Sequence, residues 1–273
     1  MDKNIWILLI EDDIFARSMM ELLFRRDWRT NVVGQVANMP ELERIFLNRS
    51  GQPKKRQERI DLALIDIDHF SKDPRWLSDV LAALNKFRPG VRIMLTGGLA
   101  DGDILADLKD YNLAGYLLKE EIRYSLAWAA SLSMFHPLIL TTGTQVLLKK
   151  MGYPIPDGTI VLNGNYSVAN LTEHETEVAR MAFLFSLERR ELSDELGISV
   201  DYSYGLISML YEKVGMKELL NGEVDPVEYL GKHSSVNSHF ESILEHMRHS
   251  SKGKDLESLA FHLLTMPDMQ KIK

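Results

Sequence analysis

Two patterns of apolar and polar positions divide the chain. Within residues 1–135, short continuous apolar runs alternate with amphipathic stretches. The runs lie at residues 5–10 (IWILLI), 30–36 (TNVVGQV), 62–67 (LALIDI), 91–96 (VRIMLT) and 115–118 (GYLL). Runs of this kind are typical of strands buried on both faces. Helical patterns lie between or after them, at residues 14–26, 40–48, 75–87, 102–110 and 120–134. Five strands interleaved with five helices predict a doubly wound parallel sheet.

From residue 171 onward the pattern is helical. Thr172 stands three residues before Glu175, which is the spacing of a capping box at a helix N-terminus. A second, short helix is expected to end at Gly197, and a third is expected to begin after Ser199. The inward face of that third helix is predicted by the helical spacing of Ser203, Ile207, Leu210 and Val214. Two further amphipathic stretches lie at residues 240–247 and 256–264.

The patterns predict an α/β fold with a five-stranded parallel sheet, followed by an all-α domain with a helical C-terminal extension. The expected boundaries are residues 1–136 for the sheet domain and 137–170 for a linker with one short helix. Residues 171–216 form the compact helical domain in this interpretation, and residues 217–273 form its extension. The extension is expected to pack on the helical domain, with dimerisation or masking of the third helix as the alternatives.

The composition of the chain indicates the cellular compartment in which the protein is expected, but not its function. The chain has 273 residues and no cysteine, so disulfides and thiolate metal sites are excluded, and a reducing cytoplasm is expected. Its first apolar run covers only residues 5–10 and is followed by three carboxylates. Such a run is too short for a signal peptide or a membrane span, so no membrane association is expected.

Charge is distributed unevenly along the chain. Residues 1–150 carry 21 basic and 20 acidic side chains, whereas residues 151–216 carry 4 basic and 10 acidic side chains. Duplex DNA is a dense line of negative charge, and contacts of Lys and Arg with phosphates supply most non-specific affinity. The acidic balance of the helical domain therefore disfavours DNA binding.

Chemistry-bearing residues follow several predicted strands at the point where each strand ends. These residues are Glu11, Asp12, Asp66, Thr96 and Lys119. Parallel strands bring their carboxyl ends to one edge of the sheet, so we expect these side chains to converge. Crowded carboxylates call for a cation, and Mg²⁺ prefers oxygen ligands that it shares with phosphate. A carboxylate beside Mg²⁺ and Lys⁺ can act as a nucleophile toward phosphorus and form an acyl phosphate.

The motifs ILLIEDD, DLALID, IMLTGG and GYLLK, in this order over residues 3–135, resemble the receiver domains of two-component response regulators. The resemblance implies a flavodoxin-like fold, with Asp66 as the acceptor of phosphate from a sensor histidine kinase. It implies Glu11, Asp12, Asp66 and the backbone carbonyl of Asp68 as ligands of Mg²⁺. It also implies Thr96 and Lys119 as phosphoryl contacts, with Thr96 and Tyr116 as the switch pair. Such a domain is no enzyme beyond its own phosphoryl transfer.

Plainer interpretations of the same residues remain open. Asp12 or Asp13 can cap the helix that follows them. Together the motifs leave a degenerate receiver that is never phosphorylated as the main alternative. Asp68 departs from the family pattern by adding a carboxylate near the phosphoryl group, which is expected to weaken or shorten phosphorylation. A stand-alone enzyme finds no support, because no nucleophile–base pair or P-loop motif is present in the sequence.

Residues 171–216 resemble the helix-turn-helix of LuxR-type response regulators. The likeness lies in Leu171, Thr172, Glu175, Glu177, Val178, Leu192, Glu195, Leu196, Ile198, Ser199, Ser208, Glu212, Lys213 and Gly215. It implies a DNA-binding transcriptional regulator, acting as a homodimer, whose third helix enters the major groove. The candidate DNA contacts are Tyr202, Tyr204, Ser208, Lys213, Arg189 and Arg190.

The outward positions of that helix also support an alternative. Asp201 repels phosphate, and Tyr204 and Met209 cannot replace a guanidinium at a guanine edge. Exposed aromatic and Met side chains are typical of protein-contact surfaces. The alternative is therefore a phosphorylation-controlled protein-interaction module whose acidic helix-turn-helix no longer binds DNA.

Overall fold

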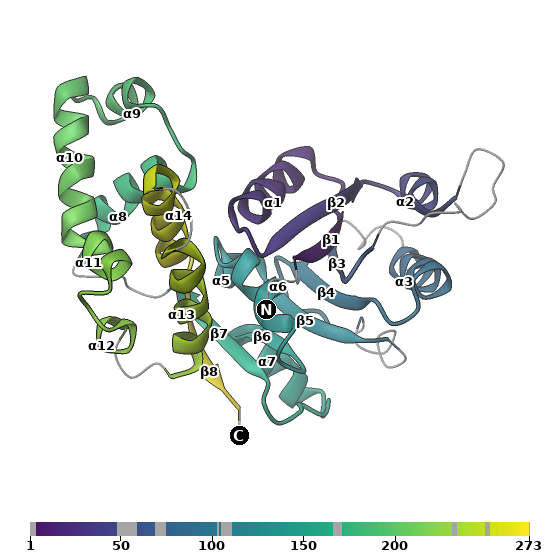
Figure 1. The fold of residues 1–273 in the computed structure, drawn as a ribbon. Coiled ribbons are helices and arrows are strands. Elements are labelled where there is room, and N and C mark those ends of the chain that lie inside the picture. The colour runs from purple at the N-terminus through teal and green to yellow at the C-terminus, as the bar shows by residue number, and fades with distance from the viewer. Residues whose placement is uncertain are drawn as a thin grey trace. The chain divides into compact units, whose positions relative to one another are not determined.

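The computed structural model describes residues 4–47, 59–68, 75–102, 104, 111–165, 171–230, 234–248 and 252–272. The chain forms two compact units (Figure 1). The first unit comprises residues 1–164 together with 270–273, and the second comprises residues 165–269. None of the helices within these described ranges is both long and apolar enough to cross a membrane.

The first unit is built on one sheet of eight strands in the order β2-β1-β3-β4-β5-β6-β7-β8. The strands are β1 (Ile5–Ile10), β2 (Thr30–Val36), β3 (Leu62–Asp66), β4 (Arg92–Gly97), β5 (Leu113–Leu118), β6 (Ile139–Thr141), β7 (Ile160–Asn165) and β8 (Pro267–Lys271). Pairing is parallel from β2 through to β7. The first five strands have the order 2-1-3-4-5 of a flavodoxin-like sheet, so the predicted α/β class is confirmed.

The helices of the first unit are α1 (Ile14–Arg26), α2 (Met39–Phe46), α3 (Trp76–Phe87), α5 (Lys119–Ile122), α6 (Leu126–Ser133) and α7 (Thr142–Lys150). The prediction of one helix over residues 120–134 was wrong. Arg123 has a φ of 44°, which breaks the helix into α5 and α6 without any Gly or Pro to signal the turn. Most of the helix predicted at residues 102–110 lies outside the described residues.

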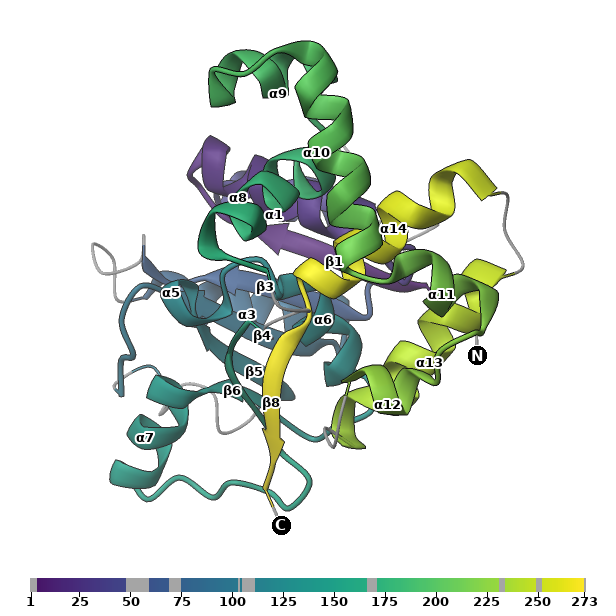
Figure 2. The ribbon, with the colours of Figure 1, turned by 90° about the vertical axis from the view of Figure 1, so that its left-hand side faces the viewer.

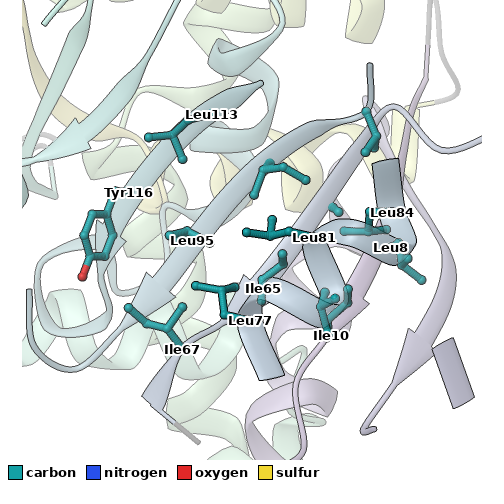
Figure 3. Close-up of a cluster of buried hydrophobic side chains, with 14 of the residues drawn as sticks. Leu8, Ile10, Ile65, Ile67, Leu77, Leu81, Leu84, Leu95, Leu113 and Tyr116 are labelled. Carbon is teal, nitrogen blue, oxygen red and sulfur yellow. The ribbon is translucent and has the colours of Figure 1, made fainter. Parts of the chain in front are cut away.

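The core of this unit lies where α3 packs on the sheet (Figure 3). Leu77, Leu81 and Leu84 of α3 are buried together with Ile65 and Leu95 of the strands. Two-sided burial explains why the strands read as continuous apolar runs rather than as alternating patterns.

Residues 137–165 are not the linker that the sequence suggested, and the rest of that predicted linker lies outside the described residues. Strand β6 pairs with β5, helix α7 follows, and β7 pairs with β6, so the sheet continues past the predicted five strands. The Thr144 hydroxyl donates to the carbonyl of Tyr116 at 2.7 Å, and the Leu118 amide donates to the Thr141 hydroxyl at 3.0 Å. Strand β5 is consequently an internal strand, with both of its edges paired.

The second unit is helical. It contains α8 (Glu173–Ala179), the π-helix η2 (Arg180–Leu184), α9 (Arg189–Leu196), α10 (Val200–Lys213), α11 (Met216–Asn221), α12 (Pro226–Leu230), α13 (Ser234–Arg248) and α14 (Lys252–Leu264). The predicted caps are present: Thr172 and Glu175 form the capping box, Gly197 ends α9 in the left-handed region, and Ser199 caps α10. The inward face of α10 is buried as expected.

The predicted extension packs on the helix-turn-helix and enlarges its core. Helix α14 lies against η2 and α11, and α13 lies against α11. The side chains of Phe240, Ile243, Leu259 and Leu263 are fully buried there. The extension does not end as a helix, however, because it ends in β8, the yellow strand of Figure 2, which stands next to β7 in the strand order of the sheet.

Candidate functional site

Three polar side chains are buried where the strands of the first unit end. Asp66 is the last residue of β3, Glu11 follows β1, and Thr96 lies near the end of β4. Asp66 and Thr96 are paired across neighbouring strands. The exposed fractions of Asp66, Glu11 and Thr96 are 2%, 2% and 1%. Parallel strands with carboxyl ends at one edge thus bring together the residues that the sequence predicted to meet.

Lys119, the first residue of α5, joins the carboxylates. Its Nζ contacts the Asp66 carboxylate and lies 3.0 Å from Oδ2 of Asp68 and 3.6 Å from Oε2 of Glu11. The lysine side chain is one-third exposed, so the site opens to solvent on this side. One ammonium group therefore contacts three carboxylates.

Burial and mutual repulsion change the proton affinities at the site. Burial, followed by the neighbouring Asp66, raises the pKa of Glu11 to about 8. Burial alone would lower the pKa of Lys119, but its bonds to Asp66 and Asp68 outweigh burial and raise that pKa above its ordinary value. The lysine is thus firmly cationic, whereas the carboxyl of Glu11 binds a proton more readily than an isolated glutamate does.

Backbone amides fix the orientation of the carboxylates. The Asp68 amide donates to Oδ1 of Asp66 at 2.9 Å, and the Asp13 amide donates to Oε1 of Glu11 at 3.0 Å. The Gly98 amide donates to Oδ1 of Asp68 at 2.6 Å. This last contact places the Asp68 side chain over the loop that follows β4.

The switch pair predicted from the sequence lies on adjacent strands. The hydroxyl of Thr96 is buried and has no hydrogen-bond partner among the described residues. Tyr116 is fully buried (Figure 3), and its hydroxyl accepts a 2.7 Å hydrogen bond from the Asp101 amide. Burial raises the pKa of Tyr116 to about 12, so the phenol stays neutral. A buried hydroxyl without a partner is costly, and such a group points to a ligand.

Of the two carboxylates that the sequence offered as caps of the following helix, Asp13 has that role. Asp13 caps α1, because its Oδ1 accepts from the amides of Phe15 and Ala16 at 2.8 Å each. Asp12 is half-buried beside Glu11. Within the described ranges, no three His, Asp or Glu side chains are already gathered around a single metal position.

The second candidate surface is the outer face of α9 and α10. Tyr202, Tyr204 and Met209 are exposed by 60%, 57% and 41%, and Ser208 and Arg190 are exposed as well. The guanidinium of Arg189 lies 5.7 Å from the centre of the Tyr204 ring. The structure therefore brings two of the candidate DNA contacts together and leaves an apolar, aromatic face open.

Lys213, another candidate DNA contact, is held by an acidic partner. Its Nζ donates to both carboxylate oxygens of Glu175, at 2.7 and 2.9 Å. This lysine, with the Thr172 amide, lowers the pKa of Glu175 to about 2. Binding of a phosphate by Lys213 would have to compete with this ion pair.

No family model matches the sequence, and no curated protein matches it. Solved structures similar to the chain are response regulators of two-component systems. RcsB in the structure of its DNA complex is 16% identical in sequence to this chain, with a TM-score of 0.43. The alignment covers 78% of this chain and 93% of the RcsB chain. RcsB from Salmonella typhimurium gives 16% and 0.42 with the same coverage. ChrA, from a heme-sensing two-component system, gives 22% and 0.36, with coverage of 78% and 90%. Likenesses this remote assign no function, which must rest on the residues of the site.

Proposed function

We propose that this chain is a response regulator in which Asp66 accepts a phosphoryl group from a sensor histidine kinase. The observation that supports this function best is the meeting of Asp66, Glu11 and Lys119 beside the unpartnered hydroxyl of Thr96. Structural ion pairs rarely leave a buried hydroxyl without a partner. A site that awaits a group with several acceptor oxygens accounts for both features.

The chemistry is a transfer between two nucleophiles. A carboxylate oxygen of Asp66 attacks the phosphorus of the kinase's phosphohistidine, and the P–O bond forms as the P–N bond breaks. The freed imidazole takes up a proton from solvent. Lys119 Nζ, which already contacts Asp66, neutralises charge on the transferring oxygens. The Thr96 hydroxyl then donates to a phosphoryl oxygen and gains the partner that it lacks.

The residues present fit a bound Mg²⁺. The carboxylates of Glu11 and Asp66 lie close together, since both contact Nζ of Lys119, and a hard divalent cation prefers such oxygen ligands. Glu11, Asp12, Asp66 and the backbone carbonyl of Asp68 would hold the ion. When bound, it supplies positive charge that stabilises the transferring phosphoryl group.

Movement of Thr96 toward a phosphoryl group provides the switch. Tyr116 lies on the neighbouring strand, and its hydroxyl is bonded to the loop that follows β4. A shift of that loop changes the space and the hydrogen bond available to Tyr116. Phosphorylation of Asp66 would thereby change the packing around Tyr116.

The substitution Asp66→Asn tests the phosphoacceptor. Labelling by acetyl phosphate with Mg²⁺, detected as a mass increase of the intact protein, is expected for the wild type and absent from the variant. Asp61→Asn is the matched control, since this carboxylate lies at the opposite end of β3. Labelling that persists in Asp66→Asn would overturn the assignment. A wild type that is never labelled would favour a degenerate receiver.

For the output we propose DNA binding by a homodimer, in the manner that the resemblance implies. Helices α9 and α10, joined at Gly197 and Ser199, have the arrangement of a helix-turn-helix, with α10 as the helix that enters the groove. Arg189 and Arg190 near the start of α9 are the basic side chains available to phosphates.

A second candidate output is supported by a specific observation. Tyr202, Tyr204 and Met209 expose an apolar face on α10, while Lys213 is already paired with Glu175. This combination suits a protein partner better than a phosphate backbone. The two outputs are distinguished by the DNA-binding experiment described in the Discussion.

A further inference from the structure

The side chain of Asp68 places a second carboxylate close to the carboxylate of Asp66. Oδ1 accepts the Gly98 amide at 2.6 Å, and Oδ2 lies 3.0 Å from Nζ of Lys119. Lys119 Nζ is also bonded to the carboxylate of Asp66. The Asp68 carboxylate thus bridges the loop after β4 and the lysine after β5, two strands away from its own strand end.

The loop after β4 is shaped for this approach. A Cβ at Gly97 would lie 2.8 Å from Cγ1 of Ile67 and 3.2 Å from Oδ1 of Asp68. A Cβ at Gly98 would lie 3.4 Å from Oδ2 of Asp68. A Cβ at Gly97, the last residue of β4, would therefore displace the side chain of Ile67 and crowd the carboxylate of Asp68, so a glycine at this position favours the close approach of that carboxylate.

A phosphoryl group on Asp66 needs the same donors. It carries three acceptor oxygens, and the described donors near these strand ends include Lys119 Nζ, the Thr96 hydroxyl, the Gly98 amide and the Asp68 amide, which already bonds Asp66. The Asp68 carboxylate already occupies the first and the third of these, whereas the Thr96 hydroxyl has no partner among the residues that the structure describes. Two anions at this distance also repel one another.

We infer that the Asp68 carboxylate is an internal substitute for the phosphoryl group, which holds Lys119 and Gly98 until phosphorylation displaces it. The inference rests on the proposed phosphoacceptor function of Asp66. Asp68 thereby lowers the affinity of the site for the incoming phosphoryl group. Phosphorylation of Asp66 consequently requires a phosphoryl donor of higher transfer potential than it would without this carboxylate.

Binding of beryllofluoride, a phosphoryl mimic that coordinates to a carboxylate, tests this inference. Fluorine NMR with saturating Mg²⁺ measures the affinity of the folded, full-length chain. Asp68→Asn keeps the size of the side chain but removes its charge, so its affinity should exceed that of the wild type by about tenfold. Asp68→Ala should act in the same direction, because the competing carboxylate is again absent.

Glu120→Gln is the matched control for net charge, since Glu120 is exposed next to Lys119 and should leave the affinity unchanged. Equal affinities of the wild type and Asp68→Asn, with melting temperatures that show both are folded, would overturn the inference and leave the proposed function intact. A tenfold gain in Glu120→Gln as well would also overturn it, because general charge would then be the cause. No binding by the wild type or by either Asp68 variant would overturn the proposed function itself.

Discussion

At the residue scale, one lysine sits among three carboxylates in a nearly buried site. Lys119 contacts Asp66, Asp68 and Glu11, and both Asp66 and Glu11 are almost completely buried. A buried cluster with surplus negative charge is a poor device for stability, because removing charges from water costs more than their pairing returns. The presence of this cluster at the carboxyl ends of the strands therefore fits a ligand-binding site.

The titration of Glu11 should make folding stability depend on pH. Its folded-state pKa of about 8 lies above the ordinary value of 4.5, so the folded protein holds this proton more tightly than the unfolded chain does. The stabilising contribution is fully present below pH 4.5 and is lost as pH rises through about 8. In chelator-containing buffer, the melting temperature of the wild type should fall relative to that of Glu11→Gln across this range.

The exposed Glu120 supplies the control for this pH series. Glu120→Gln should follow the wild type at every pH, because the side chain is solvated in both states. If the melting temperatures of the wild type and Glu11→Gln changed by the same amount between about pH 5 and pH 9, the raised pKa of Glu11 would be contradicted.

The sequence was sufficient to predict which residues meet at the site but not how each is used. Residue types at strand ends predicted that Asp66, Glu11, Thr96 and Lys119 converge, because parallel topology alone brings strand ends together. The orientation of Asp68 was not predictable. It depends on the amide of Gly98, thirty residues along the chain, and on the close packing at Gly97.

At the element scale, α10 combines a well-packed inner face with an unusual outer one. Ser203, Ile207 and Leu210 are buried, whereas Gly205 lies on the outside in the middle of the helix. A Cβ built at Gly205 meets no atom within 4 Å. The glycine is thus not required by packing within the described part of the unit.

Gly205→Ala should stabilise the second unit by about 0.5–1 kcal/mol, because Ala loses less backbone entropy in a helix. Urea unfolding measures the change. Gly197→Ala is the contrasting control: its φ of 63° is left-handed, so a Cβ there should cost about 1 kcal/mol. A loss of stability in Gly205→Ala would show that this face is covered in the folded protein.

The strands beyond β5 show the limit of pattern analysis. Strand β6 has three residues, which is too short for a periodicity, and β7 contains Asn and Gly, which are residue types typical of turns. Strand β8 begins with Pro267 and is largely polar, as suits a strand at the edge of a sheet. All three owe their conformation to pairing with partners distant in sequence, which local propensity does not encode.

At the scale of the whole molecule, the proposed phosphoacceptor site and the proposed output surface belong to different units. The site of Asp66 lies in the first unit, and the helix-turn-helix lies in the second. Few basic groups are available to the output: Arg189 and Arg190 are the basic side chains of α9, and Lys213 is engaged by Glu175. Affinity for DNA should accordingly be modest and carried by few phosphate contacts.

A salt series of duplex binding, with and without phosphorylation, measures that output. Two arginines per copy, hence four in a homodimer, predict a slope of log K against log salt of about −4 for the phosphorylated protein. The double variant Arg189→Ala/Arg190→Ala should lose most of this slope. Absence of binding in either state, down to low salt, would exclude DNA and assign Tyr204 and Met209 to a protein interface.

The position of β8 has a mechanical consequence. The chain leaves the sheet after β7, at Asn165, and returns to it at Pro267 as β8, the strand next to β7 in the strand order. The helical unit is therefore a long insertion between two adjacent strands, anchored at both of its ends. A single proteolytic cut near residue 168 would leave the fragments held together by the sheet, whereas a domain on one linker would be released. Because the β7–β8 pairing closes a loop of about a hundred residues, it should also be among the last contacts to form during folding.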